Sequence, residues 1–197
     1  LLKFARFEPD SLDEIRKISQ ELSFFDIKLL PPDLNKSDID FKIEGKDIRY
    51  GLNCIKGVSD KSLEALLEFR EGSFSNKYEA FIAAKQASLN IGCFSGLIQA
   101  GLLDSFVTKD RCKLVLEAQT FNILSDREKR NIIELGDKYD YDILRCVYEY
   151  QKDSILGDDN KPLFTAKRFE TFKKKYEPYK KIYEMNRMVF KTQVNNS

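Results

Sequence analysis

The stretch YGLNCIKGVSDKSLEALLEFR, residues 50–70, carries the strongest structural signal in this chain. Its first apolar run ends at Ile55, four residues turn the chain, and an apolar helical pattern starts at once. Two apolar segments with so short a link predict a tight helical hairpin. Two interpretations of this hairpin stay open: it only packs against the body, or its exposed backbone amides hold a phosphate.

The phosphate interpretation depends on the turn after Ile55. A helix-hairpin-helix motif joins its helices by an apolar-x-Gly-apolar-Gly turn, because the turn visits positive φ and the backbone approaches the phosphate closely. Amides at the start of the second helix, together with the helix dipole, then form an anion site that does not read bases. Gly57 and Val58 fit this pattern, and Ser59 takes the second glycine position, where it is a good N-cap. The turn is flanked by Lys56 and Lys61.

The segment before the hairpin predicts one helix and a little β-structure. Residues 11–24 begin with a capping-box sequence and continue with apolar residues at helical spacing. Residues 26–30 predict a short buried strand that ends at Pro31. Apolar residues two apart lie on either side of Glu44-Gly45-Lys46, which predicts a β-hairpin.

Beyond residue 52 the pattern is almost entirely helical. We expect a mainly α, multi-helix domain with helix-hairpin-helix elements and one small β-hairpin with short strands near the N-terminus. The helices are expected at 60–71, 78–88, 91–100, 108–122, 126–135, 140–153 and 165–188, the last with a bend or break at Pro178. The expected regions are 1–50 (with the β-hairpin), 51–124 (helical hairpins), 125–157 (helical extension) and 158–197 (linker and basic aromatic tail helix).

Composition excludes several kinds of site. The chain has no histidine, which excludes histidine-based catalysis, and its four cysteines form no CxxC pair. Carboxylate pairs such as Asp38 and Asp40 are expected in turns, so no metal site is predicted. No apolar stretch approaches the roughly 20 residues that span a bilayer, and no secretory signal is present. We therefore expect no membrane partner and a cytoplasmic location, in a bacterium or in the host of a virus.

The tail helix is basic. Residues 165–191 hold nine Lys or Arg against three Glu, a net charge of +6, whereas the whole chain has +1, so the remainder carries −5. Aromatic residues recur every three or four positions and predict an amphipathic face. Two compatible interpretations stay open. The helix packs its aromatic face and solvates its lysines, or it forms a basic surface along DNA with Lys173, Lys174, Lys175, Lys180 and Lys181.

Three ordered motifs resemble one protein family. The first contains Pro31, Pro32, Asp33, Asn35 and Ser37, the second reads Tyr-Gly-Leu-x-x-Ile-Lys-Gly-Val from residue 50, and the third is LIQAGLLDS at 97–105. In this order and spacing they resemble the late fingers region of the C-family, bacterial-type replicative DNA polymerases, over about residues 20–117. That family has a second glycine where this chain has Ser59.

The resemblance implies a fragment of a DNA-directed DNA polymerase, a nucleotidyltransferase, that grips duplex DNA without reading bases. The implied backbone contacts lie at Lys56, Gly57, Val58, Ser59, Lys61 and Arg111. The catalytic carboxylates of that family lie in a palm domain whose motifs are absent here. No catalytic residue and no cofactor are therefore expected in this segment, and synthesis would need the palm, Mg and deoxynucleoside triphosphates of a parent polymerase.

Family members also bind a sliding clamp through short peptides that insert Leu and Phe into a pocket. Asn160, Leu163 and Phe164 match such a peptide loosely. The alternative for these residues is a loop that anchors the tail helix.

A function of another class stays open for the whole chain. It is a non-enzymatic helical adaptor module, whose hairpin only packs and whose tail binds protein. A helix-hairpin-helix part of a repair nuclease would need an acidic catalytic cluster, which the sequence does not contain.

Overall fold

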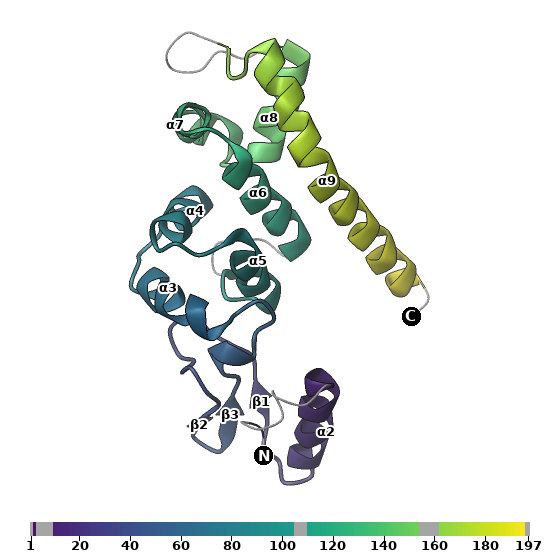
Figure 1. Ribbon diagram of the computed structural model, residues 1–197. Helices are drawn as coiled ribbons and strands as arrows, with labels where there is room; N and C mark the ends of the chain where they lie inside the picture. Colours follow the sequence, from purple (N-terminus) through teal and green to yellow (C-terminus); the bar gives the residue numbers. More distant parts are fainter. Residues whose placement is uncertain (1, 3–9, 105–109, 154–161, 196–197) are drawn as a thin grey trace. The chain divides into compact units, whose positions relative to one another are not determined.

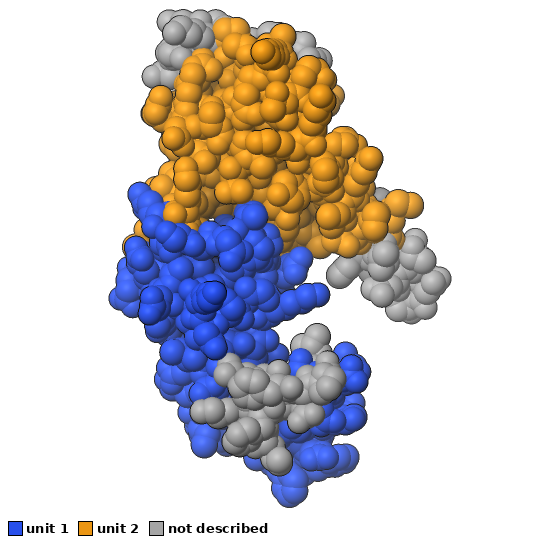
Figure 2. Space-filling view, in the orientation of Figure 1, with its two compact units in different colours: residues 1–72, 86–105 blue, residues 73–85, 106–197 orange. Residues whose placement is uncertain are grey.

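The computed structural model describes residues 2, 10–104, 110–153 and 162–195 (Figure 1). The chain forms two compact units, one from residues 1–72 and 86–105 and the other from residues 73–85 and 106–197 (Figure 2). The chain therefore passes from the first unit to the second and back before its C-terminal half completes the second.

The first unit begins with helix α2 (Ser11–Ser23) and a three-stranded sheet of order β1-β3-β2. Strands β2 (Lys42–Glu44) and β3 (Asp47–Arg49) form an antiparallel hairpin, and β1 (Leu29–Leu30) pairs with β3 in parallel. The hairpin turn contains Gly45 at φ 64°, in the left-handed region that favours glycine. The expected helix and β-hairpin are confirmed, whereas β1 is shorter than expected and only half-buried.

A small apolar core joins α2 to the sheet. Its buried side chains are Leu2 and Ile15, and the half-buried side chains that pack against them are Ile18, Leu22, Leu29, Phe41, Ile48 and Tyr50. The rings of Phe41 and Tyr50 meet edge-on, with centroids 5.1 Å apart. Phe41, Ile48 and Tyr50 of the hairpin region thus cover the apolar face of α2, whereas Ile43 of β2 is 78% exposed.

Three further helical segments complete the first unit: η1 (Leu52–Cys54), α3 (Asp60–Arg70) and α5 (Ile91–Ala100). Leu52, Leu66 and Leu97, one from each segment, have no exposed surface. Phe69 of α3 meets Phe94 of α5 edge-on, with ring centroids 5.6 Å apart. Apolar packing therefore fixes α3 against α5.

The second unit is built from helices. They are α4 (Lys77–Gln86), α6 (Arg111–Ile123), α7 (Asp126–Glu134), the short η3 (Asp137–Tyr139), α8 (Ile143–Asp153) and α9 (Ala166–Asn195). Tyr78 of α4 stacks on Phe121 of α6, with ring centroids 5.9 Å apart, and Tyr141 meets Tyr78 edge-on. These rings form the centre of the unit.

Helix α9 runs beside α6 (Figure 1). Its Phe172 has no exposed surface, and Arg168 donates to both carboxylate oxygens of Glu128 in α7 at 2.8 Å. The helix continues through Pro178 without the break that the sequence allowed. Because Lys174, four residues earlier, is exposed, solvent can satisfy the carbonyl that the proline leaves without a donor.

The mainly α fold class is confirmed, and the expected helices are present with ends that shift by a few residues. The largest change is α9, which extends to Asn195. The division of the chain into four functional regions remains a prediction. The compact units divide the chain near residues 72, 85 and 105.

Helix α6 contributes one side chain to each of two ion pairs in the second unit. Glu117 of α6 is 1% exposed and accepts from Nζ of Lys77 through both oxygens, at 2.8 and 2.9 Å. Lys113, one turn earlier, donates to Asp142 at 2.6 Å. Burial raises the pKa of Glu117 to about 6, although Lys77 acts in the opposite direction.

We expect Glu117 to lower the stability of the second unit as the pH rises. A carboxyl whose folded-state pKa is about 6, above its ordinary 4.5, contributes stability that is complete below pH 4.5 and lost as the pH rises through 6. The free energy of unfolding of the wild type, relative to Glu117→Gln, should fall by about 2 kcal/mol between pH 4.5 and 7. Urea unfolding at both pH values measures this change. A relative rise would show that the Lys77 ion pair outweighs burial.

Candidate nucleic-acid interface

The turn between η1 and α3 has the backbone conformation that its sequence predicts. Gly57 has φ 93°, in the left-handed region that other residues rarely adopt. The amide of Val58 donates to the carbonyl of Ile55 at 3.0 Å and closes the turn. Ile55 is buried, whereas Lys56 and Gly57 are exposed. The turn is therefore anchored on its inner side and open to solvent on its outer side.

Helix α3 starts directly after the turn, with Ser59 as its N-cap. The Ser59 amide donates to Oγ of Ser62 at 2.8 Å, and the same hydroxyl donates to the Ser59 carbonyl at 2.9 Å. Ser62 is buried, so this reciprocal pair fixes the first turn of the helix. As placed, the Ser59 amide already has a partner inside the protein.

Other amides at the same helix end have no partner within the described residues. They belong to Gly57 in the turn and to Asp60 and Lys61, the first two residues of α3. The N-terminus of a helix carries a partial positive charge, and the free amides of its first turn can donate hydrogen bonds to an anion. The structure thus places amide donors without a partner in the described part of the chain at Gly57, Asp60 and Lys61, displaced from Ser59 toward the first two residues of α3.

Three exposed charged side chains surround this helix end. Lys56 and Lys61 carry positive charge on either side of the turn, and neither is paired within the described part of the chain. Asp60 places one negative charge in the first turn of α3. The carboxylate stabilises the helix end but opposes a second anion there, so the balance of charge at the site is one net positive charge.

Helix α5 supports the turn from the inner side. A Cβ built at Gly96 would lie 2.1 Å from the carbonyl oxygen of Lys56, and a Cβ at Gly57 would lie 3.2 Å from that of Gly92. The backbones of α5 and the turn therefore approach each other more closely than side chains allow. Gly96 is not among the site residues predicted from the sequence. The available signal was its spacing of four from Gly92, which places both glycines on one helix face.

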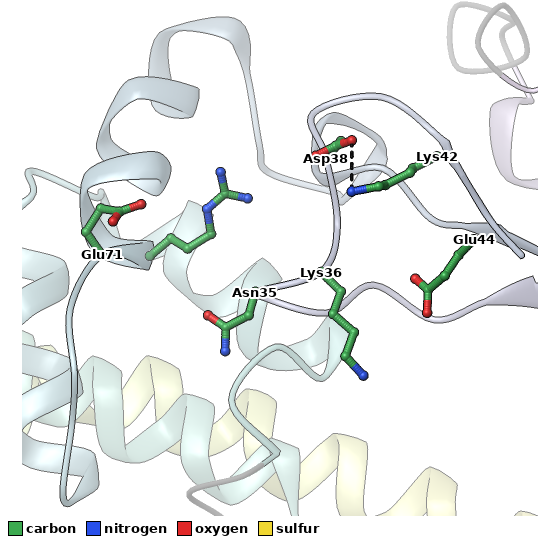
Figure 3. Close-up of a pocket in the computed structure, with 7 residues that line it drawn as sticks. Asn35, Lys36, Asp38, Lys42, Glu44 and Glu71 are labelled. Atoms are coloured by element: carbon green, nitrogen blue, oxygen red, sulfur yellow. Dashed lines mark ion pairs between the residues drawn. The ribbon is translucent and has the colours of Figure 1, made fainter.

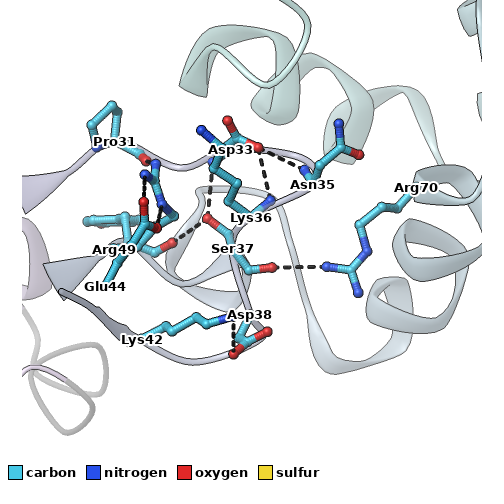
Figure 4. A network of polar contacts seen from close by, with 11 residues as sticks. Pro31, Asp33, Asn35, Lys36, Ser37, Asp38, Lys42, Glu44, Arg49 and Arg70 are labelled. Carbon is cyan, nitrogen blue, oxygen red and sulfur yellow. Dashed lines mark hydrogen bonds and ion pairs between the residues drawn. The ribbon is translucent and has the colours of Figure 1, made fainter.

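The Pro-Pro-Asp-x-Asn-x-Ser motif holds the loop after β1 together (Figure 4). The carboxylate of Asp33 accepts from the amides of Asn35 and Lys36, both at 2.9 Å. Ser37 is 1% exposed, and its hydroxyl accepts from the Asp33 amide at 3.0 Å and donates to the Tyr50 carbonyl at 2.8 Å. The motif is therefore structural in this chain.

Two arginines tie this loop to its neighbours (Figure 4). Nη1 of Arg70, at the end of α3, donates to the Ser37 carbonyl at 2.9 Å. Arg49 of β3 is buried, forms a two-point ion pair with Glu44 and donates to the Pro31 carbonyl at 2.8 Å. The hydrogen bond from Arg49 lowers the pKa of Glu44. Through Arg70, the loop fixes the end of α3 opposite the hairpin turn.

A polar pocket lies between this loop, β2 and the end of α3 (Figure 3). It is lined by Asn35, Lys36, Asp38, Lys42, Glu44, Arg70 and Glu71. Lys42 already pairs with Asp38 at 3.4 Å. Three cations and three carboxylates line the pocket, so its charges balance and it has no selective attraction for a phosphate.

The remaining predicted site residues lie in the second unit. Arg111 is exposed at the first position of α6. On α9, Lys173 pairs with Glu170 at 2.5 Å and Lys180 lies 3.8 Å from Glu184. The other predicted lysines, Lys174, Lys175 and Lys181, are exposed.

The residues that matched a clamp-binding peptide have a different role in this structure. Leu163 and Phe164 are 0% and 1% exposed, and Phe164 packs against Phe172 with ring centroids 4.9 Å apart. Arg127 of α7 donates to the carbonyls of Pro162 and Leu163, at 3.1 and 3.2 Å. As placed, neither apolar side chain can enter a partner's pocket, which favours the alternative of a loop that anchors α9. Asn160 lies outside the described residues, as does Ser105 of the third sequence motif.

Within the described ranges, no group of three or more Cys, Asp or Glu side chains is placed to hold a metal ion. In the same ranges, no helix is both long enough and apolar enough to cross a bilayer.

Comparisons with known proteins agree on the hairpin region. A family model described as a helix-hairpin-helix motif matches residues 26–114. The DNA polymerase III subunit alpha of Thermus aquaticus is 33% identical over 119 residues, 59% of this chain and 10% of that protein. Those of Aquifex aeolicus and Campylobacter jejuni are 34% and 36% identical over 99 and 104 residues, 49% and 50% of this chain and 8% and 9% of theirs. This region is similar to part of the DNA polymerase III alpha subunits.

The resemblance predicted from the three sequence motifs is therefore confirmed. The chain spans about a tenth of the length of the polymerase subunits that it matches. The matched residues include the turn at Gly57, all of α3 and all of α5. The free amides of the turn and the glycine contact behind them thus belong to the part that is similar to the polymerase relatives.

We expect Gly96→Ala to destabilise the first unit through the turn. The added methyl would meet the Lys56 carbonyl at 2.1 Å, and such overpacking costs about 1–3 kcal/mol. Gly92→Ala is the matched control on the same helix, because its methyl meets only the Asn90 side chain, at 3.2 Å. Chemical denaturation measures both variants, and the control should change the free energy of unfolding by less than about 1 kcal/mol. Equal effects of the two substitutions would contradict the close contact at Gly96.

Proposed function

We propose that this chain is a fragment of a replicative DNA-directed DNA polymerase and that residues 55–62 bind the phosphate backbone of duplex DNA without sequence preference. The observation that carries the proposal is the helix end at Gly57, Asp60 and Lys61, whose amides are free to donate to an anion. The helix-hairpin-helix match over residues 26–114 supports the same assignment.

The chemistry of the site suits a phosphate better than a base. Backbone amides at a helix end present donors only, and a phosphate oxygen is an acceptor that every nucleotide supplies. Lys56 and Lys61 add mobile positive charge, which attracts the duplex but does not distinguish bases. Such contacts suit a polymerase, which must hold any sequence that it copies.

In this proposal the chain positions the duplex for a palm domain that is not part of it. The palm would supply the catalytic carboxylates, and Mg and deoxynucleoside triphosphates would be required by the parent enzyme. The segment alone would therefore bind DNA but not extend a primer, and it would act in the cytoplasm. A primer-extension assay of the isolated chain tests this proposal, and no extension is expected.

A non-enzymatic adaptor is the second candidate, and exposed apolar side chains favour it. Phe24 and Phe25 at the end of α2 are 86% and 75% exposed, and Ile43 of β2 is 78% exposed. Exposed aromatic side chains of this size are typical of surfaces that contact another protein. Absence of duplex binding at low salt would favour this candidate.

We expect Lys56→Glu combined with Lys61→Glu to weaken binding of the full chain to duplex DNA by tenfold or more at low salt. Each lost phosphate contact lowers the slope of log affinity against log salt by about 0.9, so the double variant should lose about 1.8. Fluorescence anisotropy with a labelled mixed-sequence duplex at several KCl concentrations measures both quantities.

Lys28→Glu combined with Lys36→Glu is the matched control. These lysines are exposed in the same unit, and the control changes the net charge by the same amount. It should retain most of the affinity, because neither residue lies at the helix end. If the two double variants behave alike, the hairpin is not the DNA site.

We expect Asp60→Asn to strengthen duplex binding by about two- to fivefold, because it removes the carboxylate that opposes a phosphate at the start of α3. Glu64→Gln, one turn further along α3, makes the same change in charge away from the free amides and serves as the control. The anisotropy titration compares the two. An equal gain from both would mean that overall charge, and not the helix end, sets the affinity.

A further inference from the structure

Helix α9 has a seven-residue repeat that sorts its charged side chains into separate rows. Seven residues make almost two helical turns, so residues at this spacing lie along one face. The outer row contains Lys167, Lys174 and Lys181, and the paired row contains Lys173, Lys180 and Arg187. The two rows carry the same charge at the same spacing.

The aromatic side of α9 is covered. Phe172 has no exposed surface, and its ring stacks on those of Phe169 and Tyr176 at centroid distances of 6.0 and 5.5 Å. Burial raises the pKa of Tyr176 to about 12. Since α9 packs along α6, these rings fix which side of the helix faces inward.

Every member of the paired row has a partner on α9 itself. Lys173 pairs with Glu170 at 2.5 Å, and Lys180 lies 3.8 Å from Glu184. Arg187 donates to the hydroxyl of Tyr183 at 3.4 Å, and its guanidinium lies 5.6 Å from that ring. The charge of this row is therefore partly satisfied within the helix.

The outer row differs in this respect. Lys167, Lys174 and Lys181 are all exposed, and none forms an ion pair within the described part of the chain. At 1.5 Å per residue the row extends over about 21 Å of straight helix. Glu177 lies between the two rows and carries one negative charge. The three lysines of the outer row outnumber it, so the row keeps an excess of positive charge.

We propose that the outer row of α9 is a second contact surface for the phosphates of duplex DNA. This inference rests on the proposed function, because it assigns the same polyanion to a different surface. Three unpaired ammonium groups along one line suit a regular row of phosphates and read no sequence. The local charge of +6 over residues 165–191, against −5 elsewhere, directs a polyanion to this helix.

The test compares two triple variants of the full chain that have equal charge. The row variant is Lys167→Gln, Lys174→Gln and Lys181→Gln, and the control is Lys173→Gln, Lys180→Gln and Arg187→Gln. Glutamine has nearly the helix propensity of lysine, so α9 should stay folded, and circular dichroism checks this. Anisotropy with a mixed-sequence duplex is measured between 50 and 200 mM KCl.

We expect the row variant to lower the salt slope by about 2.7, so that the affinity lost between 50 and 200 mM KCl becomes about 40-fold smaller. The control should change the slope by less than half as much. Equal slopes for the two variants would overturn the inference and leave this face, with the exposed Ile182 and Met185, to a protein partner.

The same variants separate this inference from the hairpin proposal when they are combined with Lys56→Glu and Lys61→Glu. We expect the hairpin variant to retain some binding. If this binding is lost when the row variant is added but kept when the control variant is added, the result supports α9 as a second contact surface. An effect of the hairpin substitutions without an effect of the row overturns the inference alone. An effect of the row without one of the hairpin overturns the hairpin proposal alone, and a wild type that binds no duplex at 50 mM KCl overturns both.

Discussion

The contact between the Lys56 carbonyl and Gly96 is the constraint on which the hairpin depends. A side chain at position 96 would occupy the place of that carbonyl, 2.1 Å from the Cβ position. Because the two backbones touch, α5 fixes the position of the turn. The contact between Phe69 and Phe94 fixes the position of α3 beside α5. The amides at the start of α3 are thus held in place before any ligand arrives, which reduces the entropy cost of binding.

Helix capping and anion binding compete for the same donors at this turn. The Ser59 amide donates to Ser62, so the capping pair uses a group that the family pattern would direct to a phosphate. The free donors are the amides of Gly57, Asp60 and Lys61, and the Asp60 side chain brings an opposing charge. The capping arrangement thus stabilises α3 but leaves fewer amides to bind an anion. In the proposed DNA contact, Lys56 and Lys61 would then supply a larger share of the attraction for a phosphate.

Patterns among neighbouring residues predicted the helices and strands of this fold, but they did not predict contacts between residues far apart in the sequence. The left-handed Gly57, the Ser59 cap and the alternation of the β-hairpin follow from residues within a few positions of each other. The bond from Arg70 to Ser37 joins residues 33 apart, and Gly96 meets a turn 40 residues away. No local period encodes such pairs. The burial of Leu163 and Phe164 escaped the peptide match for the same reason. Phe164 packs against Phe172 of α9, and Arg127, 36 residues before Leu163, donates to the Leu163 carbonyl.

The rotation of α9 about its own axis decides which lysines solvent and ligands can reach. One residue of helix corresponds to a rotation of about 100°, so a different setting would bury the outer row and expose the aromatic side. The observed setting is fixed at the start of the helix, where Arg168 bonds to Glu128 and to the Ile123 carbonyl at 2.9 Å. Phe164 and Phe172 lock the same turn from the apolar side. Phe164, just before α9, and Arg168 in its first turn therefore determine which face of the helix presents the lysine row to solvent.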